Sequence, residues 1–151
     1  MQDADLFQVP EVLRHLRQGQ RAVDGGERVA DLAHRAPAVH QVQGLVARYR
    51  AEAAPGTKEK TAAVHEGLER AARALAINAG EGRYLALRGL LESMGSRLET
   101  DPARRREGAR RAVASLEAAC KANPLLQREY GPALAEARLD AGLKAPNAAQ
   151  R

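Results

Sequence analysis

The sequence contains few of the side chains from which β-sheet cores, disulfide frameworks or thiolate metal sites are built. Only 3% of its 151 residues are aromatic, and tryptophan is absent. Sandwiches and barrels draw on aromatic and β-branched residues, so this composition disfavours both. The lone cysteine, Cys120, excludes an intramolecular disulfide and a cluster of thiolate ligands. Alanine and leucine remain to form the core, which favours closely packed helices.

Long hydrophobic runs are missing as well. No stretch of about 18 apolar residues occurs, which is the length that a membrane-spanning helix needs. The first residues, Met1-Gln2-Asp3-Ala4-Asp5, are acidic and lack the apolar segment of a secretion signal. We therefore expect a cytoplasmic protein with no membrane partner.

The sequence does contain a repeat, because eleven apolar or small positions recur at a constant offset of 45 residues. The first set is Val42, Leu45, Val46, Tyr49, Ala53, Val64, Gly67, Leu68, Ala71, Ala74 and Leu75. The second set is Leu87, Leu90, Leu91, Met94, Leu98, Ala109, Ala112, Val113, Leu116, Ala119 and Cys120. The spacing within each set follows one helical face, so each segment is predicted to form a pair of amphipathic helices. A duplicated helix pair indicates a stacked, solenoid-like domain, in which Cys120 is a packing residue rather than a nucleophile.

Helix boundaries follow from capping residues and breakers. Asp101-Pro102 places a capping carboxylate before a proline suited to the first helical position, and Thr57 is predicted to cap the helix that follows it. The predicted helices span 5–18, 22–35, 38–53, 58–78, 83–98, 102–122 and 125–141. The predicted domain covers 1–142, with units at about 5–37, 38–79 and 82–124, a capping helix at 125–141 and a disordered tail at 143–151.

Five residues carry a resemblance to a known family. Ala112, Leu116, Ala119 and Pro124 have the spacing of the second helix of a tetratricopeptide repeat, in which small residues allow close helix approach and proline ends the repeat. Gly89 resembles the first-helix glycine of such repeats, where the partner helix packs closest, although each unit here is 45 residues long rather than the usual 34 or so.

This resemblance implies an all-α, right-handed stack of helix pairs that binds a protein or peptide partner. In such domains the first helices of the pairs line a concave groove. The outward residues expected to contact a partner there are Gln41, Arg48, Arg83 and Ser93. An acidic, extended peptide would suit the arginines through charge-assisted hydrogen bonds.

A narrower resemblance lies within the general one. The segments ALRGLL (86–91), DPARR (101–105), NPLL (123–126) and REYGP (128–132) together resemble the non-catalytic regions at the C-termini of large bacterial Ser/Thr protein kinases. This resemblance implies a regulatory or scaffolding role in a signalling assembly. Glycine-rich phosphate loops and metal-binding Asp-Phe-Gly motifs are absent, so the chain is not itself a kinase.

The motifs that hint at catalysis are incomplete. His65-Glu66 begins like the His-Glu-x-x-His of zinc proteases, but Glu69 occupies the position of the second histidine. Gly80-x-Gly82 lacks the third glycine of a dinucleotide site and does not follow a strand. The four histidines fall on different predicted helices without paired spacing. We therefore expect no catalytic residues, no metal, no cofactor and no enzymatic activity.

Positive charge is concentrated in one place. The formal net charge is +5, from 24 Lys and Arg against 19 Asp and Glu. The cluster comprises Arg104, Arg105, Arg106, Arg110 and Arg111. It can be interpreted as a solvated helix face. Alternatively, it is a basic surface that binds the phosphates of nucleic acid or of a phosphoprotein, or the carboxylates of an acidic peptide. Nucleic acid is the weaker alternative because the cluster has no aromatic residues to stack on bases. Self-association through an apolar repeat edge at the N-terminus is a further alternative.

Overall fold

The computed structural model describes residues 29–143, with side chains from residue 36 onward, and this part of the chain is all helical. Its five helices are α2 (Val29–Ala53), α3 (Thr57–Ile77), α4 (Gly82–Leu98), α5 (Pro102–Ala122) and α6 (Leu126–Asp140). The expected all-α class is confirmed for these residues. The predicted helix 5–18, and the predicted tail apart from Leu143, lie outside the described residues.

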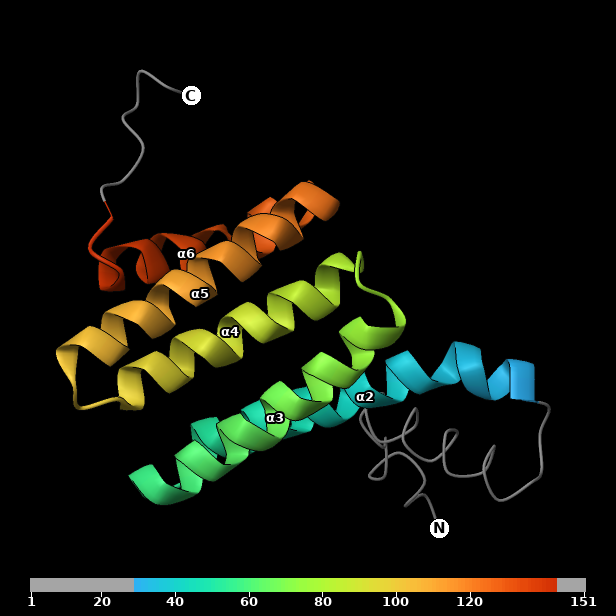
Figure 1. Ribbon diagram of the computed structural model, residues 1–151, viewed down its shortest axis with the longest axis horizontal. Helices are drawn as coiled ribbons and strands as arrows, with labels where there is room; N and C mark the ends of the chain where they lie inside the picture. The colour runs from blue at the N-terminus through green and yellow to red at the C-terminus, as the bar shows by residue number, and fades with distance from the viewer. Residues whose placement is uncertain (1–28, 144–151) are drawn as a thin grey trace, which may run out of the picture.

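The helices pack in the order in which they follow one another along the chain (Figure 1). α2 and α3 form one antiparallel hairpin, and α4 and α5 form the next. α4 also packs against α3, and α6 packs against α5, so each hairpin joins the element after it. α4 is consequently the central helix, which contacts every other described helix.

Four helices begin and end within two residues of their predicted bounds. At the start of α5 the agreement has a local cause. The Asp101 carboxylate accepts a hydrogen bond from the Ala103 backbone N–H at 3.2 Å, as expected of an N-cap. The predicted cap at Thr57 is wrong. Gly56 is the N-cap of α3, so no side chain caps this helix. The Thr57 carbonyl accepts a hydrogen bond from the Thr61 hydroxyl at 2.8 Å.

The predicted break between helices 22–35 and 38–53 is also wrong, because α2 is one helix of 25 residues that contains Pro37. A proline inside a helix removes one backbone hydrogen bond and strains the preceding turn. Pro37 is buried, and the helix packs against α3. We attribute the unbroken helix to this packing, which offsets the local cost. The predicted unit boundary at 37/38 therefore falls within a helix.

Glycines lie where helices approach most closely. A Cβ on Gly67 would lie 2.9 Å from both Leu91 methyl carbons, and one on Gly89 would lie 2.7 Å from Cγ of Leu116. Leu91 and Leu116 are among the largest fully buried side chains, together with Leu126. Glycine thus creates the space that each leucine fills, and the close approach predicted at Gly89 is confirmed.

The two hairpins match better in their second helices than in their first. The repeated positions Val64 and Ala109, like Ala74 and Ala119, are buried in both α3 and α5. In the first helices, Tyr49 of α2 is 58% exposed, whereas its counterpart Met94 packs against a buried cluster. α4 is packed between α3 and α5, which explains the difference. Among the described residues, none of the helices has the length and apolar character needed to cross a bilayer.

Candidate functional site

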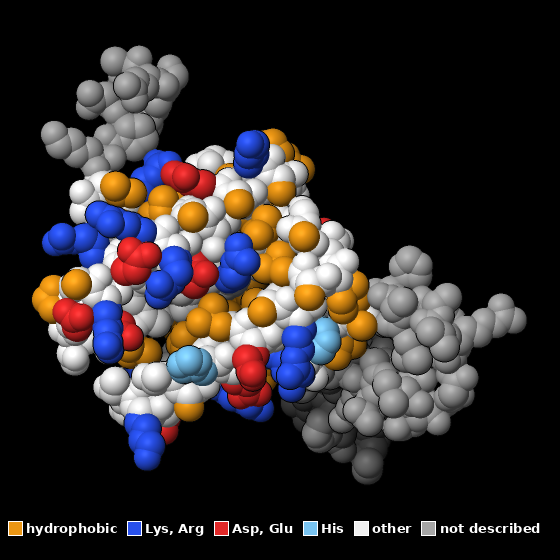
Figure 2. Space-filling model, viewed as in Figure 1, with side chains coloured by type: hydrophobic (Ala, Val, Ile, Leu, Met, Phe, Trp, Pro, Cys, Tyr) orange, Lys and Arg blue, Asp and Glu red, His pale blue; other side chains and the backbone are white. Residues whose placement is uncertain are grey.

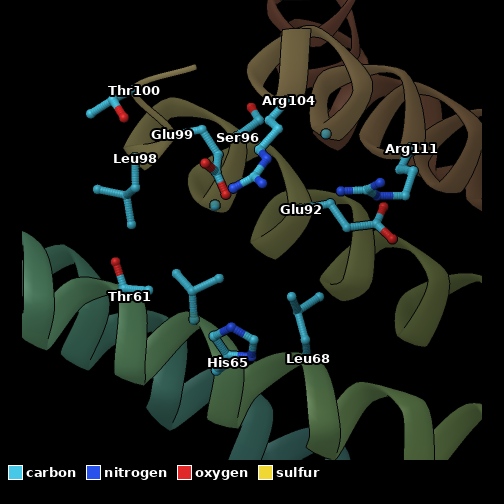
Figure 3. Close-up of a pocket in the computed structure, with 13 residues that line it drawn as sticks. Thr61, His65, Leu68, Glu92, Ser96, Leu98, Glu99, Thr100, Arg104 and Arg111 are labelled. Carbon is cyan, nitrogen blue, oxygen red and sulfur yellow. The ribbon is translucent and has the colours of Figure 1, made fainter. Parts of the chain in front are cut away.

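A groove runs between α3 and α5, with α4 as its floor, and encloses about 530 Å³ (Figure 3). It is lined by Thr61, Val64, His65, Leu68, Glu92, Gly95, Ser96, Leu98, Glu99, Thr100, Arg104, Gly108 and Arg111. The groove exists because small residues meet where α4 packs against its neighbours. A Cβ on Gly108 would lie 2.8 Å from Cβ of Ser96, and one on Gly95 would lie 3.3 Å from Val64.

The groove combines an apolar bottom with charged edges. Val64, Leu68 and Leu98 supply the apolar side chains. Figure 2 shows the same face of the molecule, where hydrophobic side chains lie in the hollow and charged ones surround it. An amphipathic segment of another protein is the kind of ligand that such a lining accommodates.

Two arginines of α5 form one edge. In Figure 3, Arg104 lies beside Glu99 and Arg111 points toward Glu92. Their ion pairs within α5 are long, with Arg104 Nε 3.8 Å from Asp101 and Arg111 Nη1 4.0 Å from Glu107. Both side chains are more than half exposed, so their guanidinium groups can still donate hydrogen bonds to a ligand.

Glu92 is the most firmly held charged group of the groove. Its carboxylate accepts a hydrogen bond from the Ser115 hydroxyl at 2.7 Å, and that hydroxyl accepts one from Arg88 Nε at 3.1 Å. Burial raises the pKa of Glu92, while the Ser115 bond and the charges of Arg88 and Arg111 act in the opposite direction. Glu92 is not among the residues predicted from the sequence. Its only local signal was an Arg88–Glu92 pair four residues apart on one helix.

The structure divides the predicted arginine cluster. Arg104 and Arg111, two helical turns apart, line the groove. Arg105, Arg106 and Arg110 lie outside it, are exposed, and have no carboxylate within 4.0 Å in the part of the chain that the structure describes. Two of the five arginines therefore line the groove, and the other three lie on the exposed surface of α5 beside it.

The residues expected to contact a partner on the first helices have different environments. Arg48 is bonded to Glu52 at 3.0 Å, Arg83 is exposed and lies 3.9 Å from Glu129, and Gln41 is half-buried. Burial, followed by Glu129, raises the pKa of Tyr130, while the charges of Arg83 and Arg48 act in the opposite direction.

The expectation of an outward Ser93 is wrong, because this residue is buried. α4 is covered by α5 on one flank, and Ser93 belongs to that flank, one turn before the Ser96 that touches Gly108. Residues 45 apart occupy equivalent positions in the repeat. A helix that is packed between two others, such as α4, nevertheless has fewer exposed residues than a helix at the end of the stack.

Metal-binding groups and the single thiol are the other features of the chain that bear on chemistry. No group of three His, Cys, Asp or Glu side chains that could hold a metal ion occurs within residues 29–143. Cys120 is half-buried, and burial followed by the Glu117 charge raises the pKa of its thiol. A raised pKa reduces the thiolate fraction and with it the nucleophilicity of the sulfur.

No protein-family model matches the chain, and neither a curated protein nor a solved structure matches it.

Proposed function

We propose that the protein is a non-catalytic interaction module, a tetratricopeptide-like stack that binds a segment of another protein in the groove between α3 and α5. The observation that carries this proposal is a groove of about 530 Å³ with leucine and valine at its bottom and Arg104, Arg111 and His65 at its edges. Its small volume suits one or a few side chains of a partner rather than a whole domain.

The lining favours a partner segment with an apolar anchor and acidic neighbours. An aliphatic side chain would fit against Val64 and Leu68, and carboxylates would bind the exposed faces of Arg104 and Arg111. The fixed carboxylate of Glu92 lies on the floor, where it would repel a second carboxylate. An acidic residue of the partner is therefore expected at the α5 edge and not above the centre of the groove.

We further propose a bacterial Ser/Thr kinase signalling assembly as the setting of this interaction. Support for the setting comes only from the resemblance of segments 86–91 and 101–105 to kinase-associated regions. Protein captured from a lysate of the native cells, identified by mass spectrometry, addresses the setting separately from the groove.

The groove is tested with an array of synthetic peptides in which a leucine is flanked by aspartate or glutamate, measured by fluorescence anisotropy. The double variant Arg104→Glu, Arg111→Glu should lose about 10-fold or more in affinity, because both edge cations are reversed. The matched control Arg105→Glu, Arg110→Glu makes the same charge change on the same helix outside the groove. It should bind within about threefold of wild type. Equal binding by the groove variant and wild type would refute the proposal.

A second candidate function is a basic module for nucleic acid or phosphorylated ligands. It is favoured by the exposure of Arg105, Arg106 and Arg110, which have no carboxylate within ion-pair distance among the described residues. In that case both double variants should weaken binding to random DNA or RNA, and binding should fall steeply with salt. Absence of binding at low salt excludes this function.

A further inference from the structure

The carboxylate of Glu92, on the floor of the groove, has a hydrogen-bond partner at one oxygen only in the part of the chain that the structure describes. Its Oε2 atom accepts the bond from the Ser115 hydroxyl at 2.7 Å. Its Oε1 atom lies 3.9 Å from Arg88 Nε, beyond hydrogen-bond distance, and Arg88 Nε donates to Ser115 instead, at 3.1 Å. Glu92 Oε1 is therefore an acceptor that a ligand in the groove can use.

This acceptor limits which ligands bind well. The Glu92 side chain is only 15% exposed, and burial raises the pKa of its carboxyl group, so the carboxylate is already poorly hydrated. A purely aliphatic ligand against Val64 and Leu68 would remove the remaining water and leave Oε1 without a donor. A ligand that fills the groove must therefore bring a hydrogen-bond donor to Glu92.

Arg111 presents the complementary group next to Glu92. Its side chain points toward Glu92 in Figure 3, and its charge acts on the pKa of that carboxyl group. No nitrogen of Arg111 lies within 4.0 Å of a Glu92 oxygen, and its ion pair with Glu107 is itself 4.0 Å long. Arg111 thus keeps N–H donors beside the Glu92 acceptor, with space between the two side chains for a small polar group.

An acceptor beside a donor matches a primary carboxamide, which is the side-chain group of asparagine and glutamine. Its NH₂ group can donate to Glu92 Oε1 while its carbonyl oxygen accepts from Arg111. A lysine ammonium offers no acceptor to Arg111, and it would add a third cation beside Arg88 and Arg111. A carboxylate would be repelled by Glu92, and a methionine side chain would satisfy neither group.

We propose that the groove selects a partner segment in which an asparagine or glutamine side chain bridges Glu92 and Arg111, beside the aliphatic anchor. This inference rests on the proposed function, because it names the partner residue that the same groove recognises. Arg104, seven residues before Arg111 on α5, remains the cation for an acidic neighbour in the partner.

Fluorescence anisotropy with synthetic peptides tests this selection. Each peptide has a leucine flanked by aspartate or glutamate, and one glutamine is placed at each position around the leucine in turn. One of these peptides should bind about 10-fold more tightly than its counterpart with methionine in place of glutamine, which lacks the hydrogen bonds to two charged groups. Glutamate or lysine at that position should weaken binding at least as much. All these peptides have the same backbone amides, so the differences report on the side chain.

Glu92→Gln tests the residue on the floor. The substitution keeps the shape of the side chain and adds a donor, so the preference for glutamine over glutamate in the peptide should fall about 10-fold or more. Glu99→Gln is the matched control, because it makes the same charge change at an exposed carboxylate of the groove. It should keep the wild-type preference within about twofold. Arg111→Met should reduce the preference for glutamine over methionine, and the circular dichroism spectra of all three variants should match that of wild type.

The outcomes separate this inference from the proposed function. If no peptide binds, the proposed function fails and the carboxamide inference fails with it. If peptides bind and Arg104→Glu, Arg111→Glu weakens them, equal affinities of the glutamine and methionine peptides at every position overturn the carboxamide inference alone. A preference for glutamine over glutamate that Glu92→Gln leaves unchanged likewise overturns it, because Glu92 is then not the residue that recognises the amide.

Discussion

At Gly89 the backbone of α4 lies directly against the side chain of Leu116 in α5. The helix on either side of Gly89 has ordinary geometry. Glycine is needed at this position because it has no Cβ, and not because of its backbone freedom. Leu116 is fully buried and belongs to a cluster with Ala112 and Leu134. A displacement of Leu116 therefore affects the contacts of both α4 and α6 with α5.

Gly89→Ala should destabilise the protein by about 1–2 kcal/mol. The added Cβ would lie 2.7 Å from Leu116 Cγ, and overpacking of this kind outweighs the gain in helix propensity. Urea unfolding followed by circular dichroism measures the change. Gly80→Ala is the control, because a Cβ there has no atom within 4 Å, and its stability should be equal to or slightly above that of wild type. Equal stability of Gly89→Ala and wild type would show that Leu116 can move at no cost.

Single residues could be predicted from the sequence where local chemistry decides their environment. The close approach at Gly89 was implied by the resemblance of this glycine to the first-helix glycine of tetratricopeptide repeats. The burial of Ser93 did not, because it depends on how far α5 covers α4. Glu92 was missed for the same reason, since its hydrogen-bond partner Ser115 is 23 residues away in sequence.

The ends of the helices differ in how they are stabilised. α5 begins with a carboxylate bonded to a free backbone N–H and with proline in the first turn. α3 begins without a side-chain cap, and its first turn carries Glu59, whose charge suits the positive end of the helix dipole.

Asp101→Ala should lower the free energy of unfolding by about 1 kcal/mol, because the Ala103 N–H loses its partner. Thr57→Ala is the informative comparison. Thr57 lies within the first turn of α3, and its side chain makes no capping bond, so this substitution should change stability by less than about 0.5 kcal/mol. Thermal and urea unfolding of both variants provide the measurement. An equal loss in the two variants would contradict the assignment of Gly56 as the N-cap.

At the level of helices, breakers that coincide with chain reversals were reliable signals. Asp101-Pro102 marks the start of α5, and Gly80 and Gly82 lie at the boundary between α3 and α4. Pro37 separates the predicted helices 22–35 and 38–53 but does not end a helix, since it lies inside α2. Whether a proline ends a helix depends on the packing available beyond it, and a local pattern does not contain that information.

On the scale of the whole molecule, long-range polar contacts join α6 to the rest of the stack. Arg97 of α4 bonds to Glu136 and Asp140 of α6, both at 3.0 Å. Arg138 of α6 bonds to Glu117 of α5 at 2.7 Å. The hydrogen bonds that Arg97 donates to Glu136 and Asp140 raise the pKa of its guanidinium, which is therefore charged near neutral pH.

Arg97→Met should loosen α6 more than any other helix. The substitution keeps the aliphatic stem and removes the bonds to both carboxylates, which are partly exposed, so the global loss should stay below about 1 kcal/mol. Amide hydrogen exchange of α6 should accelerate several-fold while exchange in α3 stays unchanged. Arg110→Met, at an exposed arginine outside the groove, should leave exchange in α6 at its wild-type rate.

The groove itself could not be predicted, because it depends on the relative placement of helices that are distant in sequence. Two of its edge residues, Arg104 and Arg111, were singled out by charge, but His65 lies on α3 and reaches the groove only through the stacking of the hairpins. The repeat predicted that hairpins would stack. The space left between their second helices depends on side-chain sizes at Gly95, Ser96 and Gly108.

The stepwise packing of the helices also bears on how quickly the chain can fold. Each described helix contacts mainly the helices immediately before and after it, and the most distant pairs, α2 with α4 and α4 with α6, are separated by one element only. The stretch of chain between residues that come into contact is therefore short throughout residues 29–143. The relative contact order is low as a result, and rapid folding is expected. Either hairpin can form first and serve as a template for its neighbour, because no contact requires the two ends of residues 29–143 to meet.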